Sequence, residues 1–297
     1  MFGLTTPLAG NEIRATSTTK KRQLGTRGMT ADGRVFRYAK AGMALYKGIP
    51  VISRVYAIGA GATWNIATDT VGGSHVPTAT FASIKFCTTG GMNDSFASLT
   101  ELQDGYLYVA VGANAGDLIQ IESNSTCGTD CGDITVYMKD DQRLTETISD
   151  TAVIFLVRNP YDDVRGLWSA TDYVTAGIGT TTSTGLTIAT PAGIPMGVPP
   201  VDVASGAYFW LQTWGLCVAY SDGGWTIGHP LYVTTTTATE NVVSALTFGL
   251  GALSTTTSTE ATNRLPPRET MPRTSWGHAV TPAAASNYGL AFLTISP

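Results

Sequence analysis

The sequence predicts an all-β protein that consists of two small β-sandwich or β-barrel domains behind an extended basic N-terminal arm. Short runs of alternating apolar and polar residues recur at intervals of roughly 8–12 residues, a spacing typical of sandwiches and barrels. Gly, Asn, Asp and Pro separate these runs, and glycine alone contributes 33 of the 297 residues. No strand pattern alternates with a long helix pattern, which argues against a parallel βαβ architecture.

The predicted arm, residues 1–40, is the most basic part of the chain. It holds eight of the 18 Lys and Arg residues but only two acids, so its formal charge is +6 in a chain of net charge −4. A basic segment with few large apolar residues buries too little surface to offset its own ordering entropy. We therefore expect it to become ordered against an acidic surface of a neighbouring subunit. The candidate partner-binding residues are Arg14, Lys20, Lys21, Arg22 and Arg27.

The first predicted β domain covers residues 41–165. A strand is expected just before it, at 34–38, where the run Arg-Val-Phe-Arg-Tyr alternates. A run of apolar and β-branched residues predicts a second strand at 51–58, and regular alternation predicts a third at 81–86.

A hairpin is the clearest local signal in this domain. Aromatic and β-branched residues fill 105–111, a glycine-containing turn follows, and 118–121 alternates again. A short helical turn is predicted at 93–102, where Asn, Asp or Ser would cap it. Two further strands are predicted at 134–138 and 152–157.

The second predicted β domain covers residues 166–297. A turn at 159–163 is expected to close the first half, and 164–200 is weakly patterned and ends in prolines that favour extended backbone. The sequence Ser-Asp-Gly-Gly at 221–224 is a strong turn signal. The predicted strands of this domain are 206–213, 214–220, 227–233, 246–250 and 288–295.

Aromatic residues gather in the first of these strands. Alternation places Tyr208, Trp210 and Gln212 on one face, with Phe209 and Leu211 on the other. An exposed Tyr and Trp platform would stack on sugar rings, whereas the same stripe would also suit a subunit seam or a domain core. Basic residues are missing nearby, which argues against nucleic-acid binding.

Residues 101–172 form the acidic part of the chain, with 13 acids against four bases. Two interpretations are open: this region receives the basic arm of a neighbouring subunit, or it is a solvated surface that keeps a charge-poor protein soluble.

The four cysteines are too few for a disulfide framework. Cys127 and Cys131 form the only close pair, so free thiols, a local disulfide and a zinc half-site remain open there. Cys87 and Cys217 lie in apolar runs and are expected to be small core residues.

Residues that would indicate an enzyme are scarce, and we expect no catalytic site, no cofactor and no metal. His75, His229 and His278 stand apart in the sequence, and His229 and His278 are expected to be structural. The sequence holds no nucleophile elbow, phosphate-binding loop or zinc-protease motif. The acid pairs Asp140-Asp141 and Asp162-Asp163 lie in turn-like sequence, where carboxylates are usually solvated.

Targeting signals are also missing from the sequence. No stretch approaches the ~18 consecutive apolar residues of a membrane span, and the N-terminus does not read as a secretory signal. We therefore expect the chain to be made and assembled inside a cell, without a membrane partner.

Several short motifs resemble segments of known virion proteins. One group resembles an N-terminal motif and a central β segment of virion structural proteins of tailed phages. A second group resembles the small β domains of capsid decoration or cement proteins. The first group is Arg27-Gly28, 32–42, 104–112, 118–124 and 158–161, and the second is 206–215, 228–233 and 276–279 with the apolar terminal strand.

The resemblance implies a virion component, often trimeric, displayed on or near the phage head. We accordingly expect a non-enzymatic decoration or cement-type subunit, assembled in the host cytoplasm, that forms a homo-oligomer with three as the preferred number. Its other partners would be the major capsid protein or other virion proteins. The alternative is a receptor- or glycan-binding head fibre or tail appendage. Buried or intersubunit aromatic residues favour the first reading, and an exposed Tyr and Trp row favours the second.

Overall fold

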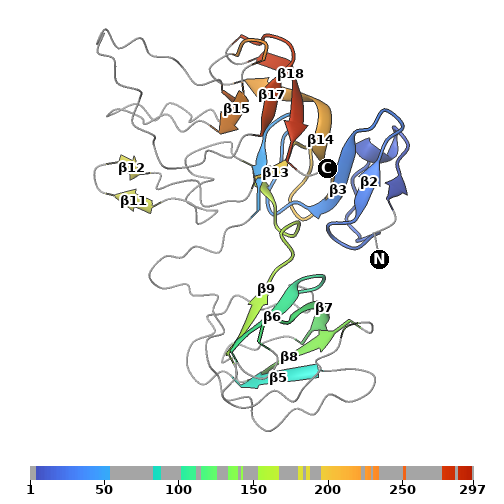
Figure 1. Cartoon of the computed structure of the whole chain (residues 1–297), viewed down its shortest axis with the longest axis vertical. Coiled ribbons are helices and arrows are strands. Elements are labelled where there is room, and N and C mark those ends of the chain that lie inside the picture. The colour runs from blue at the N-terminus through green and yellow to red at the C-terminus, as the bar shows by residue number, and fades with distance from the viewer. Residues whose placement is uncertain are drawn as a thin grey trace. The chain divides into compact units, whose positions relative to one another are not determined.

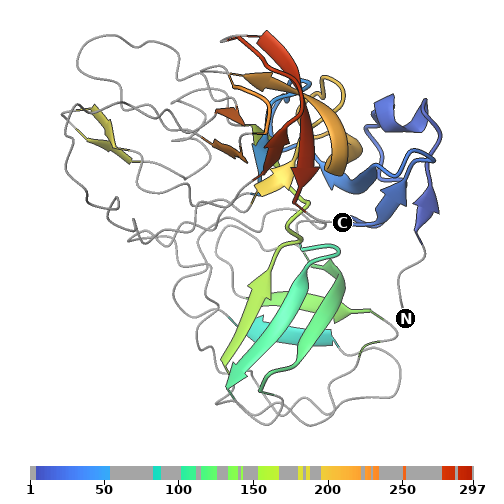
Figure 2. The same cartoon turned by 45° about the horizontal axis from the view of Figure 1, so that its top comes forward.

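The computed structural model of the chain divides into two compact units. Unit 1 comprises Met1–Val55 and Tyr161–Pro297, and unit 2 comprises Tyr56–Pro160. Among the described residues, the regular elements are β-strands and one short 3-10 helix, η1 (Glu12–Arg14) (Figures 1 and 2). The all-β prediction is therefore confirmed. The described residues are 5–53, 83–87, 102–111, 115–125, 133–139, 142, 153–166, 180–182, 185–187, 195–221, 225–228, 230–233, 250–251, 276–284 and 287–295.

Unit 1 is built on an eight-stranded sheet in which every neighbouring pair is antiparallel except β1 and β2. Two smaller sheets accompany it, in the orders β10-β4-β13 and β11-β12. The large sheet runs in the order β1 (Thr6–Pro7), β2 (Arg27–Met29), β3 (Val35–Lys40), β14 (Tyr208–Ser221), β18 (Asn287–Thr294), β17 (Gly277–Ala279), β15 (Pro230–Val233) and β16 (Leu250–Gly251). The smaller sheets contain β4 (Val51–Ile52), β10 (Arg165–Gly166), β13 (Pro195–Gly197), β11 (Thr180–Thr182) and β12 (Gly185–Thr187).

Strand β14 is the longest element and connects the two sides of the large sheet. Its first half pairs with β3 and its second half with β18, and Figure 1 shows it as a long curved strand. The sequence predicted two strands here, at 206–213 and 214–220, but the structure has one. Its register with β3 shifts between Gln212 and Trp214, which is a β-bulge, and Gly215 adopts a positive φ of 86° that favours glycine. The Gln212 side-chain amide stabilises this bend by donating to the carbonyls of Trp214 at 3.2 Å and Leu216 at 2.7 Å.

The prediction of an extended arm at residues 1–40 is wrong. Strands β1, β2 and β3 belong to the large sheet, and β3 pairs with β14 along six register positions from Val35 to Lys40. The apolar residues of this segment are few, but they pack in one cluster with the Trp210 indole. The buried cluster consists of Leu8, Ile13, Leu24, Phe36, Tyr38 and Trp210. The composition argument failed because it treated the segment alone, whereas β14 supplies both the hydrogen-bonding edge and the large side chain around which it folds.

The predicted domain boundaries, 41–165 and 166–297, also differ from those of the structure. Unit 2 is an insertion within unit 1, because the chain leaves unit 1 after Val55 and returns at Tyr161. The predicted turn at 159–163 spans this return. Its Asp163 has a positive φ of 56°, and the Tyr161 carbonyl accepts a hydrogen bond from the Lys40 backbone N–H at 2.9 Å.

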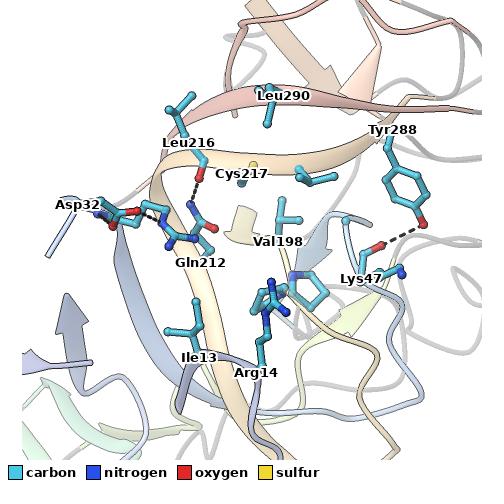
Figure 3. A pocket seen from close by; sticks show the side chains of 15 residues that line it. Ile13, Arg14, Asp32, Lys47, Val198, Gln212, Leu216, Cys217, Tyr288 and Leu290 are labelled. Atoms are coloured by element: carbon cyan, nitrogen blue, oxygen red, sulfur yellow. Dashed lines mark hydrogen bonds and ion pairs between the residues drawn. The ribbon is translucent and has the colours of Figure 1, made fainter. Parts of the chain in front are cut away.

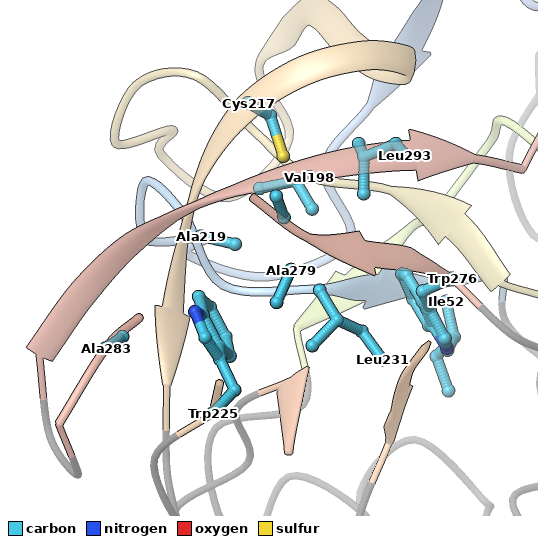
Figure 4. Close-up of a cluster of buried hydrophobic side chains, with 11 residues drawn as sticks. Ile52, Val198, Cys217, Ala219, Trp225, Leu231, Trp276, Ala279, Ala283 and Leu293 are labelled. Carbon is cyan, nitrogen blue, oxygen red and sulfur yellow. The ribbon is translucent and has the colours of Figure 1, made fainter. Parts of the chain in front are cut away.

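The core of unit 1 is shared between the large sheet and the sheet β10-β4-β13. One cluster joins Val51 and Met196 of the small sheet to Phe209 and Leu211 of β14. A second cluster joins Ile52 and Val198 to residues of β14, β17 and β18 (Figure 4). The members from the large sheet and its connections include Cys217, Ala219, Trp225, Leu231, Trp276, Ala279, Ala291 and Leu293.

Unit 2 contains one five-stranded antiparallel sheet. Its order is β5 (Ser83–Cys87), β8 (Asp133–Met138), β7 (Leu118–Asn124), β6 (Tyr106–Val111) and β9 (Val153–Val157). The predicted strands at 81–86, 105–111, 118–121, 134–138 and 152–157 and the predicted hairpin are therefore confirmed. Alternation separates the faces: Leu107, Val109, Ile119, Ile121, Val136, Met138 and Leu156 are buried, whereas Tyr108, Leu118, Tyr137 and Val157 are exposed.

Several sequence predictions fall outside the described residues. These are the helical turn at 93–101, the chain around Cys127 and Cys131, and His75 and His229.

Candidate interaction surface

The predicted partner-binding residues make different contacts in the structure. The Arg22 guanidinium lies 5.7 Å from the Trp210 ring centroid and 3.7 Å from the Glu12 carboxylate. Arg27 Nη1 donates to Thr5 Oγ1 at 3.1 Å. Both cations therefore make contacts inside unit 1.

The other three predicted residues, Lys20, Lys21 and Arg14, differ in where they lie on unit 1. Lys20 and Lys21 lie between η1 and β2, where the Lys21 backbone N–H donates to the Tyr38 hydroxyl at 3.1 Å. Arg14 is the last residue of η1, is exposed, and lines a groove on unit 1. Of the five predicted residues, only Arg14 lines this groove.

The predicted Tyr208 and Trp210 platform is not exposed for stacking. Trp210 is only 4% exposed and meets Tyr38 edge to face, with ring centroids 5.3 Å apart. Tyr38 also stacks with Tyr208, with ring centroids 5.9 Å apart. Lys40 Nζ lies 5.9 Å from the Tyr208 ring centroid. The alternation was predicted correctly, but residues 5–40 cover the face that it defines.

The exposed aromatic and aliphatic residues of unit 1 lie farther along the same strand. Three register pairs between β14 and β18 put six apolar or aromatic side chains on the outer face of the sheet. The pairs are Leu216 with Phe292, Val218 with Leu290, and Tyr220 with Tyr288. Tyr220 is half-buried, and the other five side chains are between 36% and 54% exposed. We call these six residues the outer face.

The opposite side of the same two strands is buried. Cys217 and Ala219 of β14 and Ala291 and Leu293 of β18 belong to the core cluster of Figure 4. Since successive side chains of a strand point to opposite faces, burial of this set leaves the outer face as the second apolar set. The sequence signal for this surface was an apolar residue at nearly every position from Trp214 to Tyr220. This signal did not show which of the two alternating sets of side chains would be buried.

Four residues of the outer face also line a groove of about 580 Å³ (Figure 3). Its apolar lining comes from β14, β18 and the chain after β13: Val198, Pro199, Pro200, Leu216, Val218 and Leu290. Tyr288 also lines it, and its hydroxyl donates to the Lys47 carbonyl at 3.5 Å. Partial burial and the nearby Asp202 carboxylate both raise the pKa of the Tyr288 hydroxyl, so it stays neutral at physiological pH.

Four charged residues also line the groove, and their charges do not cancel. Arg34 Nε donates to Asp32 Oδ2 at 2.7 Å, which makes a neutral pair. Hydrogen bonds from Thr30 and Arg34 lower the pKa of Asp32, so this carboxylate is ionised. Within the described part of the chain, neither Arg14 nor the Lys47 ammonium has an ion-pair partner. The Asp202 carboxylate lies close to the groove, where its Oδ1 accepts a hydrogen bond from the Lys47 backbone N–H at 2.8 Å. With Arg14, Lys47 and Asp202 counted together, the mostly apolar groove carries a formal net charge of +1.

Charge is distributed unevenly between the two units. Unit 1 holds 14 bases and 10 acids, a formal charge of +4, and unit 2 holds four bases and 12 acids, a formal charge of −8. The formal charges of the two units are therefore opposite in sign.

The described residues hold no constellation that would bind a metal. No group of three or more His, Cys, Asp or Glu side chains is close enough among them. Cys217 is a buried free thiol whose pKa burial raises from 9.0 to about 12, as predicted for a core residue rather than a nucleophile. Within the same residues, no helix combines the length and apolar composition needed to cross a bilayer.

Comparisons of the chain with protein-family models, with curated proteins and with solved structures find no match.

Proposed function

We propose that this chain is a non-enzymatic structural protein of a tailed-phage virion, a capsid decoration or cement-type subunit that associates with copies of itself. The observation that carries the proposal is the outer face of β14 and β18, where three successive register pairs are apolar or aromatic. Soluble monomers rarely expose a contiguous apolar patch without a binding role, and burial between subunits would remove this one from water.

The composition of the chain and its sequence motifs support the same proposal. Charged residues make up only 13% of the chain, about half the usual share, which suits a protein that spends its lifetime in contact with other subunits. Because the short motifs of the chain resemble those of virion proteins, we propose that it self-associates on a phage particle. The homo-oligomer, with three copies preferred, would then attach to the major capsid protein or another virion protein. Neither nucleic acid nor membrane is a proposed partner.

The N-terminal segment takes a different part in this proposal from the one its charge suggested. Residues 5–40 cover Trp210 and complete the large sheet, so they support the surface from within the subunit. The contact between subunits is assigned instead to the outer face.

The experiment combines oligomer mass with incorporation into particles. The double variant Val218→Lys and Leu290→Lys places two charges on the outer face, and the matched control changes Met29→Lys, an exposed apolar residue on β2. Light scattering is expected to give an oligomer for the wild type and the control and a monomer for the double variant. Heads assembled with the double variant are expected to carry few copies. A wild type that stays monomeric at assembly concentrations, or a double variant that is incorporated normally, would overturn the proposal.

The alternative, a receptor- or glycan-binding appendage, is favoured by one observation. Four aromatic rings line this end of the sheet as two edge-to-face pairs, Trp214 with Phe292 at 5.7 Å and Tyr220 with Tyr288 at 5.4 Å. Sugar sites combine such rings with several polar groups, but on the outer face only the two tyrosine hydroxyls are polar. Binding of the wild type to a glycan array, lost in Tyr288→Ala with the oligomer mass unchanged, would favour the appendage.

A further inference from the structure

Strand β7 of unit 2 and the residue before it bring exposed apolar side chains together with acidic ones. Leu118 begins β7, is 61% exposed, and is the register partner of Tyr108 on β6, which is 39% exposed. Asp117 directly precedes Leu118 in the turn that joins the two strands, and exposed Glu122 lies farther along β7. We call Tyr108, Asp117, Leu118 and Glu122 the acidic corner.

Backbone hydrogen bonds join β6 to the described residues that lead into β7, next to the acidic corner. The Val109 backbone N–H donates to the Asp117 carbonyl at 3.1 Å, and the Gly116 N–H donates to the Val109 carbonyl at 2.8 Å. Gly116 adopts a positive φ of 98°, which fixes the turn just before Leu118. A backbone position held by such hydrogen bonds loses little conformational entropy on binding, which favours the use of Asp117 and Leu118 as contacts.

The groove of unit 1 and the acidic corner of unit 2 are complementary in polarity and in charge. The groove of unit 1 is mostly apolar and carries Arg14 and Lys47 beside the single Asp202 carboxylate, and the acidic corner carries Tyr108 and Leu118 with two carboxylates. The formal charges of whole units, +4 and −8, have the same complementarity. A cation also reaches this part of β7: Lys139 Nζ donates to Gln120 Oε1 at 3.2 Å, at a position between Leu118 and Glu122.

We propose that the groove of unit 1 binds the acidic corner of unit 2 from a second copy of this chain. The inference rests on the proposed self-association and names the two surfaces that make it. A contact between the same outer face on two copies would bring the net positive charge of both grooves to one interface, which electrostatics disfavours. Contact between two different surfaces is heterologous, so it leaves one surface of each kind free to bind a further copy, in a closed ring where the rotation closes and in an open filament where it does not.

Two charge-reversal variants of the full chain test the proposal. The groove variant carries Arg14→Glu and Lys47→Glu, and the corner variant carries Asp117→Lys and Glu122→Lys. Each variant alone is expected to weaken self-association by roughly tenfold or more, because like charges then meet across the contact. The chain with all four substitutions is expected to recover the wild-type mass, since the signs are exchanged. Near-ultraviolet circular dichroism controls for folding.

Mixing the two single-surface variants gives the sharpest outcome. The groove variant would have acids in both surfaces and the corner variant cations in both, so the two attract each other more strongly than either attracts itself. Light scattering at equal concentrations is expected to show mixed assemblies where each variant alone is monomeric. An absence of mixed assemblies would overturn the proposal, as would a four-substitution chain that stays monomeric.

The outcomes also separate this inference from the proposed function. If the corner variant assembles like the wild type while Val218→Lys with Leu290→Lys is monomeric, the outer face is the contact and its proposed occupant is wrong. If the wild type itself is monomeric, both proposals fall.

Discussion

Both halves of β14 are rich in apolar residues, but they have different surroundings. In residues 208–213 both faces are covered: Trp210 packs with the N-terminal segment, and Phe209 packs with residues of β4 and β13. In residues 214–221 only one face is covered, and Val218 on the other face is 54% exposed. Both halves are apolar at alternate positions on both sides, so the local pattern does not explain the difference.

The difference arises from chain segments that are remote in sequence. Residues 5–40 supply Leu8, Ile13 and Leu24 to cover Trp210, and no described segment covers the outer face in the second half. One half of the strand is thus completed within the subunit. The other half retains apolar surface, and the proposals above assign that surface to a second copy.

Deletion of residues 1–40 should have the largest effect. It removes β3 from the edge of β14 and exposes Trp210, so the loss is expected to exceed the ~5–15 kcal/mol by which domains are stable. Unit 1 should then lose its near-ultraviolet circular dichroism and show red-shifted tryptophan fluorescence. The control replaces Lys20, Lys21 and Arg22 with Gln in the full chain, and we expect it to lose about 1 kcal/mol at most. A deletion with native spectra would restore the interpretation of this segment as a separate arm.

Trp210→Ala tests the covered half with a single side chain. Truncating a buried tryptophan leaves a cavity, so the free energy of unfolding is expected to fall by about 3–5 kcal/mol. The matched control is Val218→Ala on the exposed face of the same strand, which should change it by no more than about 0.5 kcal/mol. Urea denaturation measures both, and equal losses would contradict the proposed contrast between the two halves.

Trp225→Phe tests the core that lies behind the outer face. The buried indole N–H of Trp225 donates to the Thr281 carbonyl at 2.7 Å, and phenylalanine cannot replace this bond. Loss of a buried hydrogen-bond partner costs about 1–3 kcal/mol, which urea denaturation would detect. Trp214→Phe, on a half-buried ring of the same sheet, is the control and is expected to lose less.

The pH dependence of stability gives the smallest effect. Burial raises the pKa of the Cys217 thiol from 9.0 to about 12, so the folded state retains a proton that the unfolded state releases. The stabilisation from this thiol is complete below pH 9 and is lost as the pH rises toward 12. Between pH 9 and pH 10 the wild type is expected to lose about 1 kcal/mol more than Cys217→Ala. Parallel pH profiles for the two proteins would show that Cys217 is not buried as described.

The sequence by itself determined where many strands lie. Alternation and turn residues located β3, the hairpin of β6 and β7, and β18, because strand formation depends on side chains within a few positions of one another. The turn signal at 159–163 also marked the place where the chain returns to unit 1. For the candidate surface, basic composition selected Arg14 but not Lys47, which lies outside the charged cluster and reaches the groove only through the fold.

Only the tertiary structure decided which strands pair and which faces stay exposed. The pairing of β3 with β14 and of β14 with β18 joins segments far apart in the chain, and no local pattern encodes those partners. The same holds for burial: Trp210 and Val218 both sit in apolar runs, yet one is covered by residues 5–40 and the other is not. The physical reason is that the hydrophobic effect is non-directional, so an apolar sequence requires cover without specifying which segment, or which subunit, provides it.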